Sequence, residues 1–247
     1  MPKTVRLAAW NLNHRTGRKP VPVEVAEALK AIDADVVVLT EYVDGEHQAE
    51  FKKALRKARF ESLAVSVAGP KQNQVLIAAR TAMVDEDLLP LPGYTEAAAT
   101  NWLHRKLPDY DLEIVGMRAP AYELQRDKKA YWSQVGSILQ SAADRPIVFI
   151  GDVNCDPFSD NSPGSQALLA LAEHGYQLSN PDGECSYFGP SGARTRIDHV
   201  LASRTVRLEE TLYRTEAGGL TLAGPGGGTA LSDHAVLFVS ASLCRGD

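Results

Sequence analysis

The sequence has few cysteines and no long apolar stretch, and each shortage excludes a class of protein. Its three cysteines are an odd number and never stand as a CxxC pair, so neither a disulfide framework nor a zinc site is indicated. We expect reduced thiols and a cytoplasmic location. Nowhere do about eighteen apolar residues follow one another. The first ten residues also lack the pattern of a secretory signal, so the sequence predicts neither a membrane span nor export.

The sequence also lacks an excess of basic residues, with 26 Lys and Arg against 31 Asp and Glu. A net charge of -5 and a pI near 5.7 argue against a protein that coats nucleic acid through many unpaired Lys and Arg side chains. They do not exclude an enzyme that meets phosphate through a metal ion. With 247 residues, 44% of them hydrophobic, the chain can bury a large core. We expect residues 1–247 to form one domain and the protein to be a monomer.

Several apolar runs end abruptly on polar residues. The central run, 147–150, is followed by Gly151 and Asp152. A continuous run of this kind is typical of a strand buried on both faces. On an extended chain, Asp152 and Asn154 would point the same way and serve one site. Alternatively, the two residues only form the turn that ends the strand.

The order of the expected elements predicts an α/β fold. Strand candidates outnumber helix candidates by roughly two to one, which favours two mixed β-sheets packed face to face with flanking helices. The segment 206–214 is expected to be the hairpin partner of the strand at 195–201. Residues 83–106 show no clear hydrophobic periodicity of a helix or a strand, and His104 is interpreted as an ordinary packing residue. Amphipathic periodicity predicts helices at 22–32, 49–60 and 163–174.

The polar residues at the strand ends form one candidate site. If the strands bring them to a single edge, four carboxylates would repel one another unless a cation lies among them. Carboxylate and amide oxygens with a single histidine favour Mg²⁺ or Mn²⁺ over zinc. Magnesium commonly keeps its waters and accepts substrate phosphate as a ligand, which indicates phosphoester hydrolysis. The set consists of Asn11, Glu41, Asp152, Asn154, Asp198, Asp233 and His234.

Five short motifs carry a resemblance to a known family. Each is weak alone, but in this order, from residue 10 to residue 234, they resemble the endonuclease/exonuclease/phosphatase superfamily with the deoxyribonuclease I-like fold. The resemblance implies a four-layered α/β sandwich with its site at one rim of the two sheets, and Mg²⁺ (or Mn²⁺) as cofactor. The motifs are Trp-Asn-Leu-Asn, Leu-Thr-Glu, Gly-Asp-Val-Asn, Arg-Ile-Asp-His and Ser-Asp-His.

The resemblance also implies a set of metal ligands. Glu41 is similar to the principal metal-binding glutamate, and Asn11 to its polar neighbour, which takes part in both metal binding and catalysis. Asp233 resembles the carboxylate near that metal. Asn13 stands where some nucleases of the family have an additional metal-site aspartate. The metal affinity and the number of metals, one or two, therefore stay open.

The catalytic roles follow from the same resemblance. Asp152 would activate or orient the attacking water, a role worth about 10²–10⁴ in rate. Asn154 would hold the water or the phosphate. His234, steadied by Asp198, would donate to a non-bridging oxygen of the phosphate as negative charge develops there.

Basic residues on the segments next to the proposed rim are candidates for substrate binding. Arg118 stands where many family members present Thr-His-Leu or Tyr-Val-Pro, and it could clamp phosphate as a permanent cation or simply pair with a nearby acid. Arg126 and Arg196 are the other two candidates for substrate binding. A local basic surround on an acidic protein suits a polyanion, although each group alone is compatible with ordinary surface. Further basic residues near the rim are Arg15, Arg18, Lys19, Lys128 and Arg194.

We therefore expect a metal-dependent phosphoester hydrolase, a nuclease or phosphodiesterase whose phosphate-bearing substrate is nucleic acid. The alternatives are a phosphomonoesterase of the same fold acting on inositol or sugar phosphates, and a non-catalytic descendant that binds phosphate-bearing partners. Ser232 beside His234 leaves a serine hydrolase as a further alternative, although no GxSxG motif accompanies it. The sequence leaves open DNA, RNA or a small phosphoester, and endo- or exo-attack.

Overall fold

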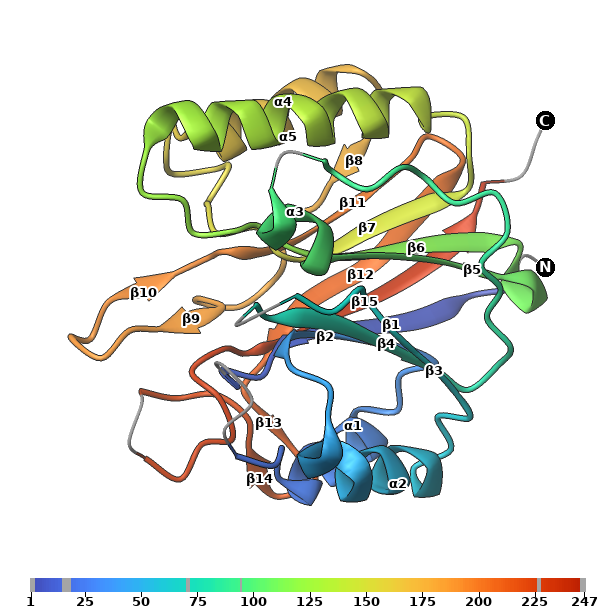
Figure 1. Cartoon of the computed structure of the whole chain (residues 1–247), viewed down its shortest axis with the longest axis vertical. Helices are drawn as coiled ribbons and strands as arrows, with labels where there is room; N and C mark the ends of the chain where they lie inside the picture. The colour runs from blue at the N-terminus through green and yellow to red at the C-terminus, as the bar shows by residue number, and fades with distance from the viewer. Residues whose placement is uncertain (1–2, 15–18, 70–71, 94, 226–227, 245–247) are drawn as a thin grey trace.

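Two β-sheets lie face to face at the centre of the computed structural model, which describes residues 3–14, 19–69, 72–93, 95–225 and 228–244 (Figure 1). The six-stranded sheet has the order β12 (Val206–Arg214), β15 (Val236–Leu243), β1 (Val5–Asn11), β2 (Val36–Tyr42), β4 (Gln74–Ala79) and β3 (Ser62–Val65). The five-stranded sheet has the order β5 (Trp102–Leu107), β6 (Leu112–Arg118), β7 (Ile147–Asp152), β11 (Asp198–Ala202) and β8 (Gln177–Leu178).

Helices cover the outer face of each sheet, and the predicted four-layered α/β sandwich is confirmed (Figure 1). Two helices, α1 (Val23–Ile32) and α2 (Ala49–Lys57), pack on the six-stranded sheet. Two others, α4 (Gln125–Ser141) and α5 (Pro163–Glu173), pack on the five-stranded sheet. In the described ranges no helix is both long and apolar enough to cross a membrane. The short elements are α3 (Glu96–Thr100), the 3₁₀ turns η2 (Glu46–Gln48) and η3 (Pro108–Tyr110), and the hairpins β9 (Tyr187–Phe188) with β10 (Arg194–Thr195) and β13 (Glu216–Ala217) with β14 (Leu220–Thr221).

Parallel strand pairs bring polar strand ends to one rim. In the six-stranded sheet β1 and β2 run parallel and are joined through α1, while in the five-stranded sheet β6 and β7 run parallel and are joined through α4. Every residue of β2 is buried, as its β-branched run predicts for a strand covered on both faces. Parallel strands end at the same edge, so the ends of β1 and β2 are neighbours, and so are those of β6 and β7.

The expected pairing of 206–214 with the strand at 195–201 is wrong. The segment 206–214 forms β12, which pairs antiparallel with β15 in the other sheet. The reason lies in the sheet edges: β11 already has β7 on one side and β8 on the other, so it offers no free edge. The chain therefore crosses from one sheet to the other between Ala202 and Val206.

The indecisive segment 83–106 contains a buried polar network at the end of the five-stranded sheet away from the ends of β6 and β7. His104 on β5 is buried, its Nδ1 accepts the backbone N–H of Leu89 at 2.8 Å, and its Nε2 lies 2.9 Å from Oε2 of Glu113. Arg145 closes the network with two bonds to Glu113, of 2.6 and 3.1 Å. Burial is the main cause that lowers the pKa of His104 to about 4, against the opposing charge of Glu113.

A close contact between the two sheets, at Gly116, generates a stability prediction. A Cβ added at Gly116 on β6 would lie 2.6 Å from Cγ1 of Val38 on β2. Gly116→Ala should therefore lower the free energy of unfolding by about 1–3 kcal/mol through overpacking. Adding Val38→Ala should recover part of this loss, since the smaller side chain makes room, and urea unfolding of the double-mutant cycle measures the coupling.

Gly136, in the middle of α4, supplies the control. A methyl group there would meet nothing within 4 Å, so Gly136→Ala should stabilise the helix by about 0.5–1 kcal/mol. A Gly116→Ala protein as stable as the wild type would show that the sheets do not depend on this contact.

His104 generates a pH prediction. An unfolded histidine has a pKa of 6.5, and the folded value here is about 4. Between these values the unfolded chain binds a proton that the folded chain does not, so stability is complete above pH 6.5 and falls as the pH drops toward 4. Between pH 7 and pH 5, urea unfolding should show a loss about 2 kcal/mol larger for the wild type than for His104→Gln. The exposed His47→Gln serves as control, and equal losses in all three proteins would contradict the assignment.

Candidate active site

The two sheets meet at the rim through a hydrogen bond between strand ends. Nδ2 of Asn11, at the end of β1, donates to Oδ2 of Asp152, at the end of β7, over 2.9 Å. Both side chains are buried. Two residues that lie 141 positions apart are thereby fixed against each other.

Glu41 owes its orientation to an irregular backbone. The pairing of β2 with β4 shifts register between Leu39 and Tyr42, and Glu41 has a φ of +51°. Non-glycine residues seldom adopt this left-handed conformation, and its strain persists only where the surroundings enforce it. The irregularity lets the strand re-aim one side chain at its end. Local sequence gives no sign of it, because Thr-Glu-Tyr is compatible with a regular strand.

Arg118 lies between the acids of the two sheets. Its Nη2 is 2.9 Å from Oε1 of Glu41, and its Nε is 3.5 Å from Oδ2 of Asp152. The pairing with a nearby acid, one of the two interpretations of Arg118, is therefore the one found. Within the described ranges, no group of three or more His, Cys, Asp or Glu side chains could hold a metal ion. Within the rim, the guanidinium of Arg118 separates the carboxylates of Glu41 and Asp152.

His234 and Asp198 form the expected pair. Nδ1 of the buried imidazole is 2.9 Å from Oδ2 of Asp198. Burial alone would lower the pKa of His234, but the charge and hydrogen bond of Asp198, with help from Asp152 and Asp233, raise it to about 9. At neutral pH the imidazole is therefore protonated and acts as a hydrogen-bond donor. Asp233 lies alongside, with Oδ1 4.0 Å from Nε2 of His234.

Asp152 is a carboxylate that holds a proton more readily than usual. Burial is the largest cause, and the charge of Asp198, its register partner across β7 and β11, is the second. Together they raise the pKa of Asp152 to about 6, although His234, Arg118 and Asn11 act in the opposite direction. A carboxylate with a pKa near neutrality is a competent proton acceptor at neutral pH.

Asn154 departs from the extended conformation expected for it. With a φ of +51°, its backbone N–H bonds Oδ1 of Asp152 at 3.0 Å, and its Nδ2 donates to the backbone oxygen of Ala119 at 2.6 Å. The turn-forming interpretation is therefore correct for the backbone. The same bonds hold the side chain beside Asp152, and its role in binding water or phosphate stays a prediction.

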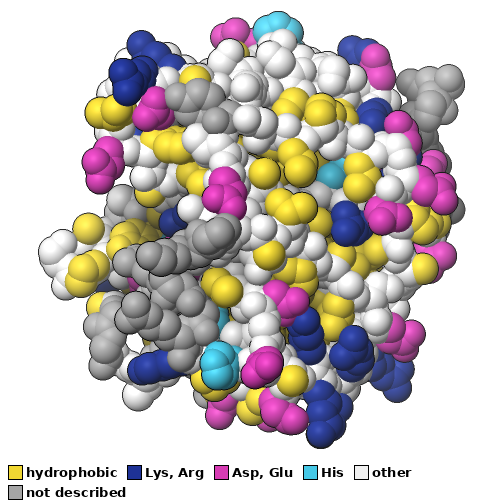
Figure 2. Space-filling view, viewed as in Figure 1, with side chains coloured by type: hydrophobic (Ala, Val, Ile, Leu, Met, Phe, Trp, Pro, Cys, Tyr) yellow, Lys and Arg dark blue, Asp and Glu magenta, His cyan; other side chains and the backbone are white. Residues whose placement is uncertain are grey.

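The remaining candidate arginines are less closely tied to this cluster. Arg196 is occupied by the loop before β9: it donates to the backbone oxygens of Gly183 and Pro181 and to Asn180, and its guanidinium lies over the ring of Tyr213. Arg126 is exposed and pairs with Asp127. Arg15 and Arg18 lie outside the described residues. On the face shown in Figure 2, basic side chains stand in small groups among acidic and apolar ones. Binding of substrate by Arg126 and Arg196 stays a prediction.

Sequence reasoning missed two aromatic residues that position His234. Nε1 of Trp10 donates to the backbone oxygen of His234 at 2.8 Å. The ring of Tyr187, at the base of the β9–β10 hairpin, lies 5.0 Å from the imidazole. Trp10 opens the first motif and could have been included on that ground. Tyr187 has no comparable signal, since its contact depends on where the hairpin folds back.

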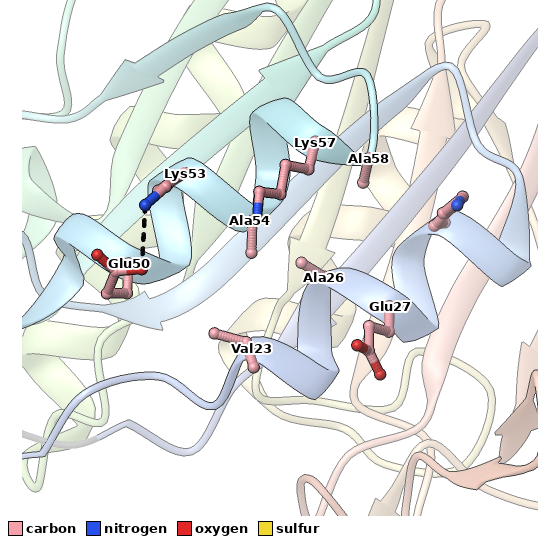
Figure 3. Close-up of a pocket in the computed structure, with 9 residues that line it drawn as sticks. Val23, Ala26, Glu27, Glu50, Lys53, Ala54, Lys57 and Ala58 are labelled. Atoms are coloured by element: carbon pink, nitrogen blue, oxygen red, sulfur yellow. Dashed lines mark ion pairs between the residues drawn. The ribbon is translucent and has the colours of Figure 1, made fainter.

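Among the hollows lined by described residues, one lies between two outer helices and another adjoins the rim. A groove of about 310 Å³ runs between α1 and α2, over Ala26 and Ala54, and mixed lysines and glutamates line it, including the Glu50–Lys53 pair (Figure 3). It belongs to the outer helical layer and shares no residue with the rim. A second hollow of about 230 Å³ is lined by Asn154 and by the segments that follow β6 and β7.

Fold and rim together define a class: a two-sheet α/β sandwich whose strand ends hold a buried His/Asp pair beside a buried carboxylate with a raised pKa. The family model for the endonuclease/exonuclease/phosphatase family matches residues 8–234, and the chain belongs to this family. None of the curated proteins matches the chain.

Solved structures share the fold at low sequence identity. A 3' phosphatase, NExo, from Neisseria bound to a product DNA hairpin is 18% identical, with a TM-score of 0.68 over 98% of this chain and 100% of that one. An AP endonuclease from Archaeoglobus fulgidus is 15% identical, with a TM-score of 0.68 over 95% and 98%. A family protein from Bacteroides thetaiotaomicron is 14% identical, with a TM-score of 0.69 over 99% and 100%.

Ser232 provides a test of the serine-hydrolase alternative. Its Oγ donates to the backbone oxygen of Asn11 at 2.6 Å and accepts the backbone N–H of His234 at 3.1 Å, so the hydroxyl ties two segments together. Ser232→Ala should lower the free energy of unfolding by about 1–3 kcal/mol. It should reduce hydrolysis of bis-p-nitrophenyl phosphate by less than about tenfold, whereas removal of a nucleophilic serine typically costs a factor of about 10⁴ or more. Ser137→Ala, on the exposed face of α4, is the control.

Proposed function

We propose that this protein is a metal-dependent phosphoester hydrolase, a nuclease or phosphodiesterase in which water attacks the phosphorus. The observation that supports this best is the buried arrangement of Asp152 between Asn11 and Asp198, with His234 protonated beside it. It supplies one proton acceptor and one hydrogen-bond donor at the same rim. The chain belongs to the endonuclease/exonuclease/phosphatase family, and one structural neighbour is a 3' phosphatase bound to a product DNA hairpin, which supports phosphoester hydrolysis as the reaction class.

The oxygen donors at the rim suit a hard divalent cation. Glu41 already binds a cationic group, the guanidinium of Arg118, and Asn11 and Asp233 supply further oxygens at the same rim. Mg²⁺ is often held by one or two carboxylates, with waters and substrate phosphate completing its shell. We propose that Glu41, with Asn11 and Asp233, holds Mg²⁺ or Mn²⁺. When bound, the ion would polarise the phosphate and offset the negative charge of the transition state.

Different side chains of the rim then accept the proton of the water and stabilise the charge on the phosphate. Asp152, ionised above pH 6, accepts the proton of the attacking water, and Asn11 fixes its carboxylate through their 2.9 Å bond. Asn154, held by Ala119, contacts the water or the phosphate. His234 donates to a non-bridging phosphate oxygen, and Asp198 keeps the imidazole protonated and oriented. Donation of this kind gains strength as charge develops on that oxygen.

The substrate class is proposed from the neighbours. The Neisseria structure holds a product DNA hairpin, and the Archaeoglobus structure is that of an AP endonuclease, so a nucleic-acid phosphodiester is the first candidate. A phosphomonoester is the second, because the same Neisseria protein is described as a 3' phosphatase. In either case, Arg126 and Arg196 are proposed to contact the polyanion outside the phosphate undergoing attack.

Replacing either His234 or Asp152 should leave the fold intact and strongly lower the activity. His234→Ala should lower Mg²⁺-dependent hydrolysis by about 10²–10³, the typical loss of one charge-stabilising donor. Asp152→Asn should lower it by about 10²–10⁴, because the amide cannot accept the proton of water. The assay uses plasmid, single-stranded DNA, RNA, bis-p-nitrophenyl phosphate and inositol phosphates with Mg²⁺, Mn²⁺ or EDTA.

The control is Arg204→Met, which should retain full activity. Arg204 is exposed and follows β11 at the end away from the rim. Turnover confined to monoesters would replace the nuclease proposal with the phosphatase alternative. Binding of these substrates without turnover under any metal condition would support the non-catalytic alternative. Undiminished hydrolysis by His234→Ala would contradict the assigned role.

A further inference from the structure

Arg118 places a positive charge between carboxylates of the two sheets at the rim. Its guanidinium joins Glu41 of the six-stranded sheet, at 2.9 Å, to Asp152 of the five-stranded sheet, at 3.5 Å. The side chain is 16% exposed and the Glu41 side chain 5%. A guanidinium carries a permanent positive charge. Its contacts with the two carboxylates offset this charge and so lower its attraction for phosphate while they persist.

Only the side chain of Arg118 would have to move for the contacts to break. The backbone of Arg118 is fixed in β6, opposite Asp152 in register, and its N–H bonds the oxygen of Asn101 at 2.9 Å. The next residue, Ala119, bonds the backbone oxygen of Asp152 at 2.8 Å. A guanidinium at the end of a long flexible stem can leave Glu41 without disturbing either bond.

Arg118 and a divalent ion compete for the same carboxylate. A metal bound by Glu41 would meet the full positive charge of the guanidinium, and like charges at contact distance in a buried site repel strongly. The guanidinium therefore reduces the attraction of the rim for a metal ion.

We propose that Arg118 occupies the metal's carboxylate in the free protein, and that a divalent ion binds by displacing its guanidinium, which then turns to the substrate phosphate. The inference rests on the proposed metal-dependent function. It makes metal and phosphate mutually dependent: a phosphate that engages Arg118 releases Glu41 for the metal, and the metal releases Arg118 for the phosphate. By linkage, each ligand tightens the binding of the other by the same factor.

Metal binding, measured without turnover, tests the inference. Isothermal titration calorimetry of the full chain with Mn²⁺ gives the affinity with and without dilute inorganic phosphate, at concentrations that keep Mn²⁺ in solution. Arg118→Met should bind Mn²⁺ about tenfold more tightly than the wild type without phosphate. Phosphate should tighten Mn²⁺ binding several-fold in the wild type and not in Arg118→Met. Arg118→Lys, which keeps the charge without the forked geometry, should lie between the two.

Two further variants complete the design. Arg204→Met removes the same charge at the far end of β11 and should leave the Mn²⁺ affinity at the wild-type value, while Glu41→Gln should abolish binding. Arg118→Gln gives a second neutral replacement should the methionine protein unfold, as thermal melting will show. An unchanged or weakened affinity in the neutral Arg118 variants overturns the inference and leaves the proposed function standing. Absence of Mn²⁺ binding in the wild type, with and without phosphate, overturns the metal-dependent function itself.

Discussion

The packing of the two sheets against each other is the constraint on which the rim depends. Gly116 lets β6 approach Val38 of β2 closely, and the two parallel strand pairs then end at the same level of the sandwich. Across the same interface between the sheets, Asn11 bonds Asp152 over 2.9 Å. The site is therefore a product of the apolar core between the sheets and not of any single loop. A change deep in that core would alter distances between polar groups that have no direct contact with it.

The same packing places charges where water is scarce. Burial of an isolated ion is costly, and the rim offsets this by alternating signs: Asp198 lies against His234, and Arg118 lies against Glu41 and Asp152. The compensation is uneven. The acidic neighbours of His234 outweigh its burial and raise its pKa to about 9. Asp152 keeps its proton up to about pH 6, because burial and the charge of Asp198 outweigh the effects of Arg118 and Asn11. Both pKa values are raised, yet they lie on opposite sides of neutral pH, so the carboxylate can accept a proton while the imidazole donates a hydrogen bond.

Local sequence patterns predicted which residues belong to this site better than they predicted the contacts between the elements that carry them. Apolar runs that stop on Asn11, Glu41 and Asp152 identified strand ends, because burial on both faces leaves a continuous apolar signature. The pairing of β12 escaped prediction, since it depends on which strand edges remain free after the sheets assemble. The left-handed backbone of Glu41 escaped for a related reason: tertiary contacts enforce it against local preference.

The partner of Arg118 illustrates the limit of sequence reasoning most clearly. A phosphate clamp and an internal ion pair place the same demands on the residue itself: a permanent charge, a forked donor and a flexible stem. What decides between them is the distance to an acid on the other sheet, which the local sequence does not contain. In the folded chain that acid is Glu41, at 2.9 Å, so the carboxylate that a metal would take and the guanidinium that a phosphate would take already neutralise each other. Neither ligand alone can restore that balance, because a metal without phosphate strands the guanidinium beside a second cation, and a phosphate without metal leaves a buried carboxylate uncompensated.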